Sequence, residues 1–195
     1  MDCNLMSFNY KRARIFGYKM TLTGEMIGKR STPHIHNEIQ YSGRYEFISC
    51  SATMAESADS VRFKFIGYSH EAERWDKVRL PYSDEQEDKA WAESCRMADL
   101  PIDWLKDKDK YLVNGLFYRG ENAVKYDKIG QLCHLSQGQI WKPSKDKTWC
   151  TKAVAAAMYK ADVYFWYLIL RYLNEDELRP DQLHYIAGYF YGKYD

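Results

Sequence analysis

A cysteine at a predicted helix start is the first residue of this sequence that could do chemistry. Trp149-Cys150-Thr151 stands directly before the Ala-rich segment 150–160, whose composition predicts a helix. The positive end of the helix dipole lowers the pKa of a thiol placed there and favours the thiolate, which is the nucleophile. Backbone N–H groups of the first turn, including that of Cys150, could stabilise an oxyanion. The alternative is a small buried side chain, as most free cysteines are.

A second group of reactive side chains lies in the segment His34-Ile35-His36-Asn37-Glu38. In a regular strand, residues i, i+2 and i+4 point to one face, so we expect His34, His36 and Glu38 to line up. Three interpretations stay open at this point: an exposed polar strand face, a metal site of the His-x-His plus carboxylate type, and a catalytic base with an orienting carboxylate.

The two groups together suggest a Cys–His–carboxylate triad. The histidine comes first and the cysteine last, which is the reverse of the order in ordinary papain-like enzymes.

The remaining cysteines indicate a reducing environment. Cys3, Cys50, Cys95 and Cys133 bring the total to five, widely spaced and without a CxxC pair, so neither a disulfide framework nor a cysteine-type zinc site is predicted. We see no signal peptide and expect a cytoplasmic location. The most apolar run, 163–170, is too short for a membrane span and predicts a buried helix.

Length and charge narrow the class further. A chain of 195 residues predicts a single domain. The charges of the 28 basic and 27 acidic residues nearly cancel, so the chain lacks the overall positive charge that would attract nucleic acid. We interpret Lys11, Arg12 and Arg14 as a solvated segment. The chain contains 8 Phe, 6 Trp and 17 Tyr, which argues against disorder and predicts an aromatic core.

The hydrophobic pattern predicts strands in the first half and helices in the second, which is an α+β class. Ser83 and Gln86 form a capping box at the start of the first long helix, and Asn114-Gly115 predicts a turn. We interpret 1–17 as an N-terminal extension and 99–113 as an insertion. The expected strands are 18–22, 35–41, 45–51, 61–68 and 75–80; the expected helices are 84–97, 123–132, 150–160, 163–173 and 181–189, with Pro180 in the first turn of the last.

Several segments resemble the circularly permuted NlpC-type papain-like cysteine peptidases and amidases, the YaeF/YiiX-like branch that includes versions from tailed phages. They are His36-Asn37-Glu38, the strand pair within 61–81, Tyr126-Asp127-Lys128-Ile129-Gly130, Trp149-Cys150-Thr151-Lys152-Ala153-Val154, and Leu178-Arg179-Pro180-Asp181-Gln182-Leu183. Together these segments span about residues 30–190, and the resemblance rests on their order and spacing. Thr151-Lys152 stands where the family has a Ser-Glu pair.

The resemblance implies a single permuted papain-like domain over 1–195, with a small antiparallel sheet packed against the nucleophile helix. It implies Cys150 as nucleophile, His36 as general base and Glu38 as third member, without a cofactor or metal. Tyr126, Trp149 and His34 are the candidates for oxyanion or substrate binding. The expected reaction is hydrolysis of an amide bond in a peptide, peptidoglycan or lipid-like substrate.

Two alternatives remain beside the hydrolase. One is a non-catalytic binding or inhibitor protein of the same fold that acts on a host protein. The other is a metal-binding protein built on His34, His36 and Glu38.

Overall fold

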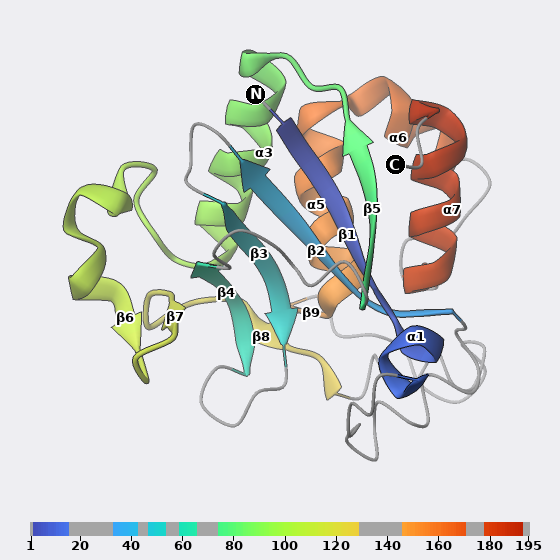
Figure 1. Ribbon diagram of the computed structural model, residues 1–195. Coiled ribbons are helices and arrows are strands. Elements are labelled where there is room, and N and C mark those ends of the chain that lie inside the picture. The colour runs from blue at the N-terminus through green and yellow to red at the C-terminus, as the bar shows by residue number, and fades with distance from the viewer. Residues whose placement is uncertain are drawn as a thin grey trace.

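The structure is a computed structural model, and it describes residues 2–15, 33–42, 47–53, 59–65, 74–128, 146–170 and 178–192. Its strands form one open sheet, and helices pack against one face of that sheet (Figure 1). The class is α+β with a mainly antiparallel sheet, as the sequence predicts.

The sheet has the strand order β5-β1-β2-β3-β4-β7-β6, and all neighbours in this order are antiparallel. Strand β8 pairs with β4, and β9 pairs with β8 in parallel. The bounds are β1 Asp2–Asn9, β2 His34–Ser42, β3 Ile48–Thr53, β4 Ser60–Phe65, β5 Trp75–Leu80, β6 Leu112–Val113, β7 Phe117–Tyr118, β8 Lys125–Tyr126 and β9 Lys147–Thr148.

Four of the expected strands are found. Strands β2 and β5 match the segments 35–41 and 75–80 within one or two residues. Strands β3 and β4 occupy the described parts of 45–51 and 61–68. The expected strand 18–22 lies outside the described residues.

The N-terminal strand β1 corrects the sequence-based prediction. Residues 1–17 are expected to form an extension, but β1 pairs with β2 on one side and β5 on the other, so it lies inside the sheet. Cys3 and Leu5 enter the core, whereas the Asn4 side chain donates to Gln40 Oε1 at 3.2 Å. Because its polar side chains bond across the sheet, β1 lacks the apolar alternation by which a strand is recognised in sequence.

The helices mostly agree with expectation. Ser83 Oγ accepts the Gln86 N–H and the Gln86 side chain accepts the Ser83 N–H, which completes the predicted capping box. Helix α5 packs on β2 and β3, while α7 packs on β1, β2 and β5. The bounds are α1 Tyr10–Ile15, α3 Asp84–Met97, the 3-10 helix η1 Trp104–Tyr111, α5 Cys150–Ala161, α6 Val163–Leu170 and α7 Pro180–Tyr191.

Helix α6 is the apolar run that the sequence predicts to be a buried helix. It buries Trp166, whereas Tyr164 and Tyr167 are exposed, so the described side chains of this helix are not all buried. None of the helices in the described part of the chain is long and apolar enough to cross a membrane.

Aromatic side chains form the centre of the core, as predicted. Trp91 and Trp104 stack with their planes 9° apart, and Phe63 lies 4.9 and 5.4 Å from their ring centroids. Tyr41 meets Trp91 edge to face at 5.2 Å. Trp104 belongs to the expected insertion 99–113, so that segment is anchored in the core even though most of its other side chains face solvent.

Short strands replace part of an expected helix near residue 125. Asn114 and Gly115, with φ of 52° and 67°, turn the chain between β6 and β7, as their types predict. The helix expected at 123–132 is wrong at its start, because Lys125 and Tyr126 form β8 and pair with β9. Residues from 129 onward lie outside the described residues.

Gly120 allows a close approach between two backbone segments. Its N–H donates to the Ala98 carbonyl at 2.8 Å, and a Cβ at this position would overlap the Asp99 carbonyl oxygen. We expect Gly120→Ala to lower the free energy of unfolding by about 3 kcal/mol or more, because backbone cannot swing aside. In the control, Gly115→Ala, the new methyl group meets nothing within 4 Å, so only the positive φ costs about 1 kcal/mol. Urea denaturation measures both, and equal losses would contradict the overlap.

Candidate active site

A β-bulge in β2 separates the two histidines of the His34-x-His36 motif. Phe8 pairs with His36 and Asn9 with His34, so one step along β1 spans two steps along β2. His34 thereby turns toward α7, whereas His36 points together with Glu38. The sequence predicts all three side chains on one face, which requires a regular strand, and the bulge is the reason they are not.

Glu38 lies at the centre of a buried hydrogen-bond network. His36 Nε2 donates to Glu38 Oε1 at 3.2 Å, and Ser49 Oγ donates to Oε2 at 2.7 Å. Arg62 Nη2 adds a charged contact to Oε1 at 3.4 Å. The carboxylate is 4% exposed, so these partners replace the water that a buried charge needs. The network holds the His36 ring in one orientation.

Cys150 is the first residue of α5, as predicted. The N-cap residue Trp149 makes no side-chain bond to the helix, and the first turn carries no acidic side chain. Across from it, the Asn37 backbone N–H donates to the thiol sulfur. Thr151 Oγ1 lies 3.8 Å from Sγ and donates to Asn37 Oδ1 at 3.1 Å. These bonds fasten the start of α5 to β2 next to Cys150 Sγ.

The thiol of Cys150 and the imidazole of His36 lie close enough that each shifts the pKa of the other. Burial alone would raise the pKa of Cys150, but the positive charge of His36, its hydrogen bond and the Asn37 N–H together lower it below its usual value. Burial alone would lower the pKa of His36, but Cys150 and then Glu38 raise it to about 9. Both directions favour a thiolate–imidazolium pair at neutral pH.

A gap between two strands of the sheet explains why the Asn37 backbone N–H faces the Cys150 thiol. Strands β2 and β3 pair only over residues 39–41 of β2. Beyond that point, Ser51 Oγ donates to the Asn37 carbonyl at 2.6 Å in place of a ladder bond. The N–H and C=O of a strand residue point toward the same neighbour, so the Asn37 N–H also faces this gap. Cys150 Sγ accepts it there.

Two further candidates from the sequence, Tyr126 and Trp149, lie beside the thiol and are buried. Tyr126 pairs with Thr148, two residues before Cys150 in the chain. Burial and then the negative charge of Cys150 raise the pKa of Tyr126 well above its usual value, so its hydroxyl stays protonated. The Trp149 ring packs against the Lys152 ammonium group at 5.2 Å from the ring centroid.

The third candidate, His34, belongs to a different cluster. Its Nε2 lies 2.6 Å from Asp76 Oδ2, and burial lowers its pKa to about 3. Among the described residues, the metal-ligating side chains that meet closely are His34, Asp76 and His184. The metal set considered as an alternative from the sequence, His34 with His36 and Glu38, is therefore not assembled among the described residues.

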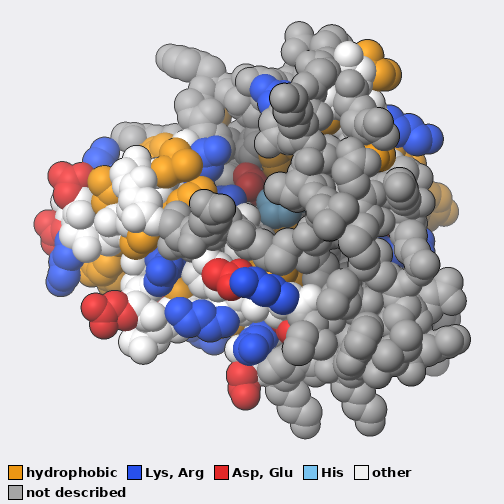
Figure 2. Space-filling view, turned by 90° about the horizontal axis from the view of Figure 1, so that it is seen from below, with side chains coloured by type: hydrophobic (Ala, Val, Ile, Leu, Met, Phe, Trp, Pro, Cys, Tyr) orange, Lys and Arg blue, Asp and Glu red, His pale blue; other side chains and the backbone are white. Residues whose placement is uncertain are grey.

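Aromatic rings border the His36 side of the site. Phe8 is the cross-strand neighbour of both His36 and Trp75, and the Trp75 ring lies 5.2 Å from Phe8 and 6.1 Å from His36. The His36 side chain is 25% exposed, whereas Cys150 is 3% exposed. Figure 2 shows a histidine side chain at the surface beside acidic and basic side chains. The imidazole is therefore the more accessible member of the pair.

Sequence reasoning missed Asn37, Ser49 and Arg62. The Asn37 contribution is a backbone N–H, which residue type does not reveal. Ser49 and Arg62 lie on β3 and β4, and their convergence on Glu38 depends on the pairing of three strands. The alternation of Arg62 with buried Val61 and Phe63 was the available signal, because it places the arginine on the face opposite the aromatic core.

Comparison with known proteins gives no family assignment. No family model, no curated protein and no solved structure matches this chain. The resemblance to the NlpC-type peptidases therefore remains a prediction.

Proposed function

We propose that this protein is a cysteine hydrolase that cleaves an amide bond with Cys150, His36 and Glu38. The observation that carries the proposal is a thiol at the start of α5, which the bond from Thr151 to Asn37 ties to β2, near an imidazole whose Nε2 is bonded to a buried carboxylate. A nucleophile, a base and an orienting group linked in this way produce a reactive thiolate. A histidine strand that precedes the nucleophile helix supports a permuted papain-like topology of NlpC type.

The proposed reaction has two stages. The Cys150 thiolate attacks the carbonyl carbon, a C–S bond forms, and the carbonyl electron pair moves to oxygen, where first-turn N–H groups of α5 stabilise it. Collapse of this intermediate breaks the C–N bond, and the His36 imidazolium gives its proton to the leaving amine. Water then attacks the thioester while His36 takes one water proton. The acid leaves and the thiolate is restored.

The surroundings of the pair favour an acyl group with an apolar part. The rings of Phe8 and Trp75 lie next to His36, the more accessible member of the pair. An acyl chain or an apolar side chain would bury surface against them, at about 25 cal/mol per Å². This fits a peptide, peptidoglycan or lipid-like amide.

Acylation by p-nitrophenyl acetate tests the proposal without knowledge of the natural substrate. We expect a burst of p-nitrophenol followed by steady turnover, because attack of the thiolate releases the phenol and leaves an acetyl thioester. Peptide mapping should place the acetyl group on Cys150 and not on Cys3, Cys50, Cys95 or Cys133. Absence of a burst together with acetylation spread over the cysteines would contradict the proposal.

A binding function without catalysis is the second candidate. Many aromatic side chains of the last two helices face solvent, which is typical of a surface that contacts another protein. A stable complex with a host protein that is unchanged by Cys150→Ala would favour this function over the hydrolase. The exposed side chains are Val163, Tyr164, Tyr167, Tyr185, Tyr189 and Phe190.

A further inference from the structure

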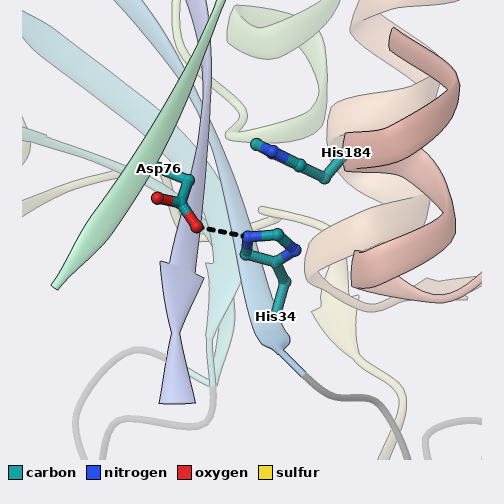
Figure 3. A group of neighbouring side chains, drawn as sticks. All are labelled: His34, Asp76 and His184. Carbon is teal, nitrogen blue, oxygen red and sulfur yellow. Dashed lines mark hydrogen bonds and ion pairs between the residues drawn. The ribbon is translucent and has the colours of Figure 1, made fainter. Parts of the chain in front are cut away.

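A second cluster of ligating side chains lies between the sheet and α7. His34 comes from β2, Asp76 from β5 and His184 from α7, so three segments distant in sequence meet here (Figure 3). One ligand atom from each lies within 4.8 Å of those from the other two. The rings of His34 and His184 have centroids 4.0 Å apart. None of these residues is needed by the proposed hydrolase.

The register of the sheet places this cluster on the face opposite His36. Ser7 is the cross-strand neighbour of Asp76, and Asn9 is that of His34. Residues 7 and 9 of β1 point to the face that α7 covers, because Ser7 Oγ is bonded to His184. The bulge in β2 thus gives two separate histidine sites on the two faces of one sheet.

Hydrogen bonds already orient the three side chains. Ser7 Oγ lies 3.0 Å from His184 Nδ1, which leaves Nε2 of that ring as the ligand atom. Asp76 Oδ1 is paired with Arg12, and Asn9 Nδ2 donates to Oδ2 at 2.8 Å. Metal ligands in proteins are held by outer partners of this kind.

We propose that His34, Asp76 and His184 form a binding site for a zinc-class divalent cation. Two imidazole nitrogens and one carboxylate oxygen, with a fourth position for water, are a ligand set that suits zinc. Bonds of about 2.0–2.2 Å to a tetrahedral ion require ligand atoms about 3.4 Å apart. The ligand atoms lie within 4.8 Å of one another, so shifts of about 1 Å would be needed to reach that spacing. The 2.6 Å bond between His34 Nε2 and Asp76 Oδ2 would have to open to admit the ion.

The charge of the cluster selects against hard cations. Arg12 offsets the single carboxylate, so the site offers little net negative charge and only one carboxylate group. Calcium and magnesium need several oxygen ligands, whereas imidazole nitrogen suits zinc, cobalt and nickel. Asp76 is 28% exposed, which gives an ion a path from solvent. The bound ion would fasten α7 to the sheet.

Isothermal titration of the chelator-treated full chain with zinc chloride tests the proposal. We expect about one zinc per chain, with a thermal midpoint that rises on addition of zinc but not of calcium or magnesium. Asp76→Asn and His184→Gln should each weaken zinc binding at least ~100-fold, because each removes a direct ligand, whose loss costs at least as much as loss of an outer partner. Circular dichroism checks that both variants are folded.

The matched control is Cys150→Ala, which removes another place among the described residues where zinc could bind, a thiolate beside a histidine. This variant should keep the zinc affinity of the unaltered chain. Cobalt gives a second readout, since ligation by nitrogen and oxygen produces visible d–d bands without a thiolate charge-transfer band. No saturable zinc binding, an affinity unchanged in both ligand variants, or an affinity lost in Cys150→Ala would each overturn the proposal.

Discussion

Replacing Cys150 with alanine is expected to abolish turnover of p-nitrophenyl acetate and of amide substrates while the fold is kept. The thiolate sulfur is the protein atom that forms a covalent bond to the substrate in the proposed reaction, so the rate should fall about 10,000-fold or more. Alanine is a strong helix former and tolerates the first position of α5. Steady-state rates measure the loss, and far-UV circular dichroism measures the fold.

Cys95→Ala is the matched control for this result. Cys95 lies inside α3, and burial raises the pKa of its thiol, so it stays protonated and unreactive. We expect this variant to keep full turnover, while the loss of a core side chain lowers the free energy of unfolding by about 1 kcal/mol. Equal turnover in Cys150→Ala and the unaltered protein would exclude the proposed hydrolase.

Replacing His36 with alanine is expected to shift the pH dependence of thiol alkylation toward high pH. In the unaltered protein, His36 and Asn37 lower the pKa of Cys150 against the effect of burial. Alkylation therefore stays fast as pH falls below 9 and slows only when pH passes through the lowered pKa of the thiol. Without the imidazolium, burial dominates and raises the pKa above 9. The thiolate fraction at pH 7 then drops to about 1% or less.

The measurement is the rate of iodoacetamide labelling of Cys150 between pH 5 and 10, followed by peptide mapping. Glu38→Gln is the graded control, since the amide keeps a hydrogen bond to the ring but removes the charge, and we expect an intermediate shift. Identical pH profiles for His36→Ala and the unaltered protein would show that the histidine does not ionise the thiol.

Local patterns predicted much of the architecture because their causes are local. The capping box at Ser83 and the helix start at Cys150 depend on residues a few positions away, and both are found as expected. Strand β5 likewise carries its own pattern and its stop at Pro81. Strand β1 escaped prediction since its polar side chains are satisfied by neighbouring strands, which a single segment does not reveal.

The candidate site, like the fold, was predictable from the sequence only where its causes are local. The sequence by itself determined that a cysteine begins a helix and that a histidine and a glutamate lie two residues apart on a strand. The tertiary structure decided that His36 meets Cys150, that Arg62 neutralises Glu38, and that His34 leaves the group for Asp76. Register and bulges are set by contacts between strands distant in sequence, and a shift of one residue turns a side chain to the other face. One such bulge made two histidine sites from a motif that the sequence presents as one.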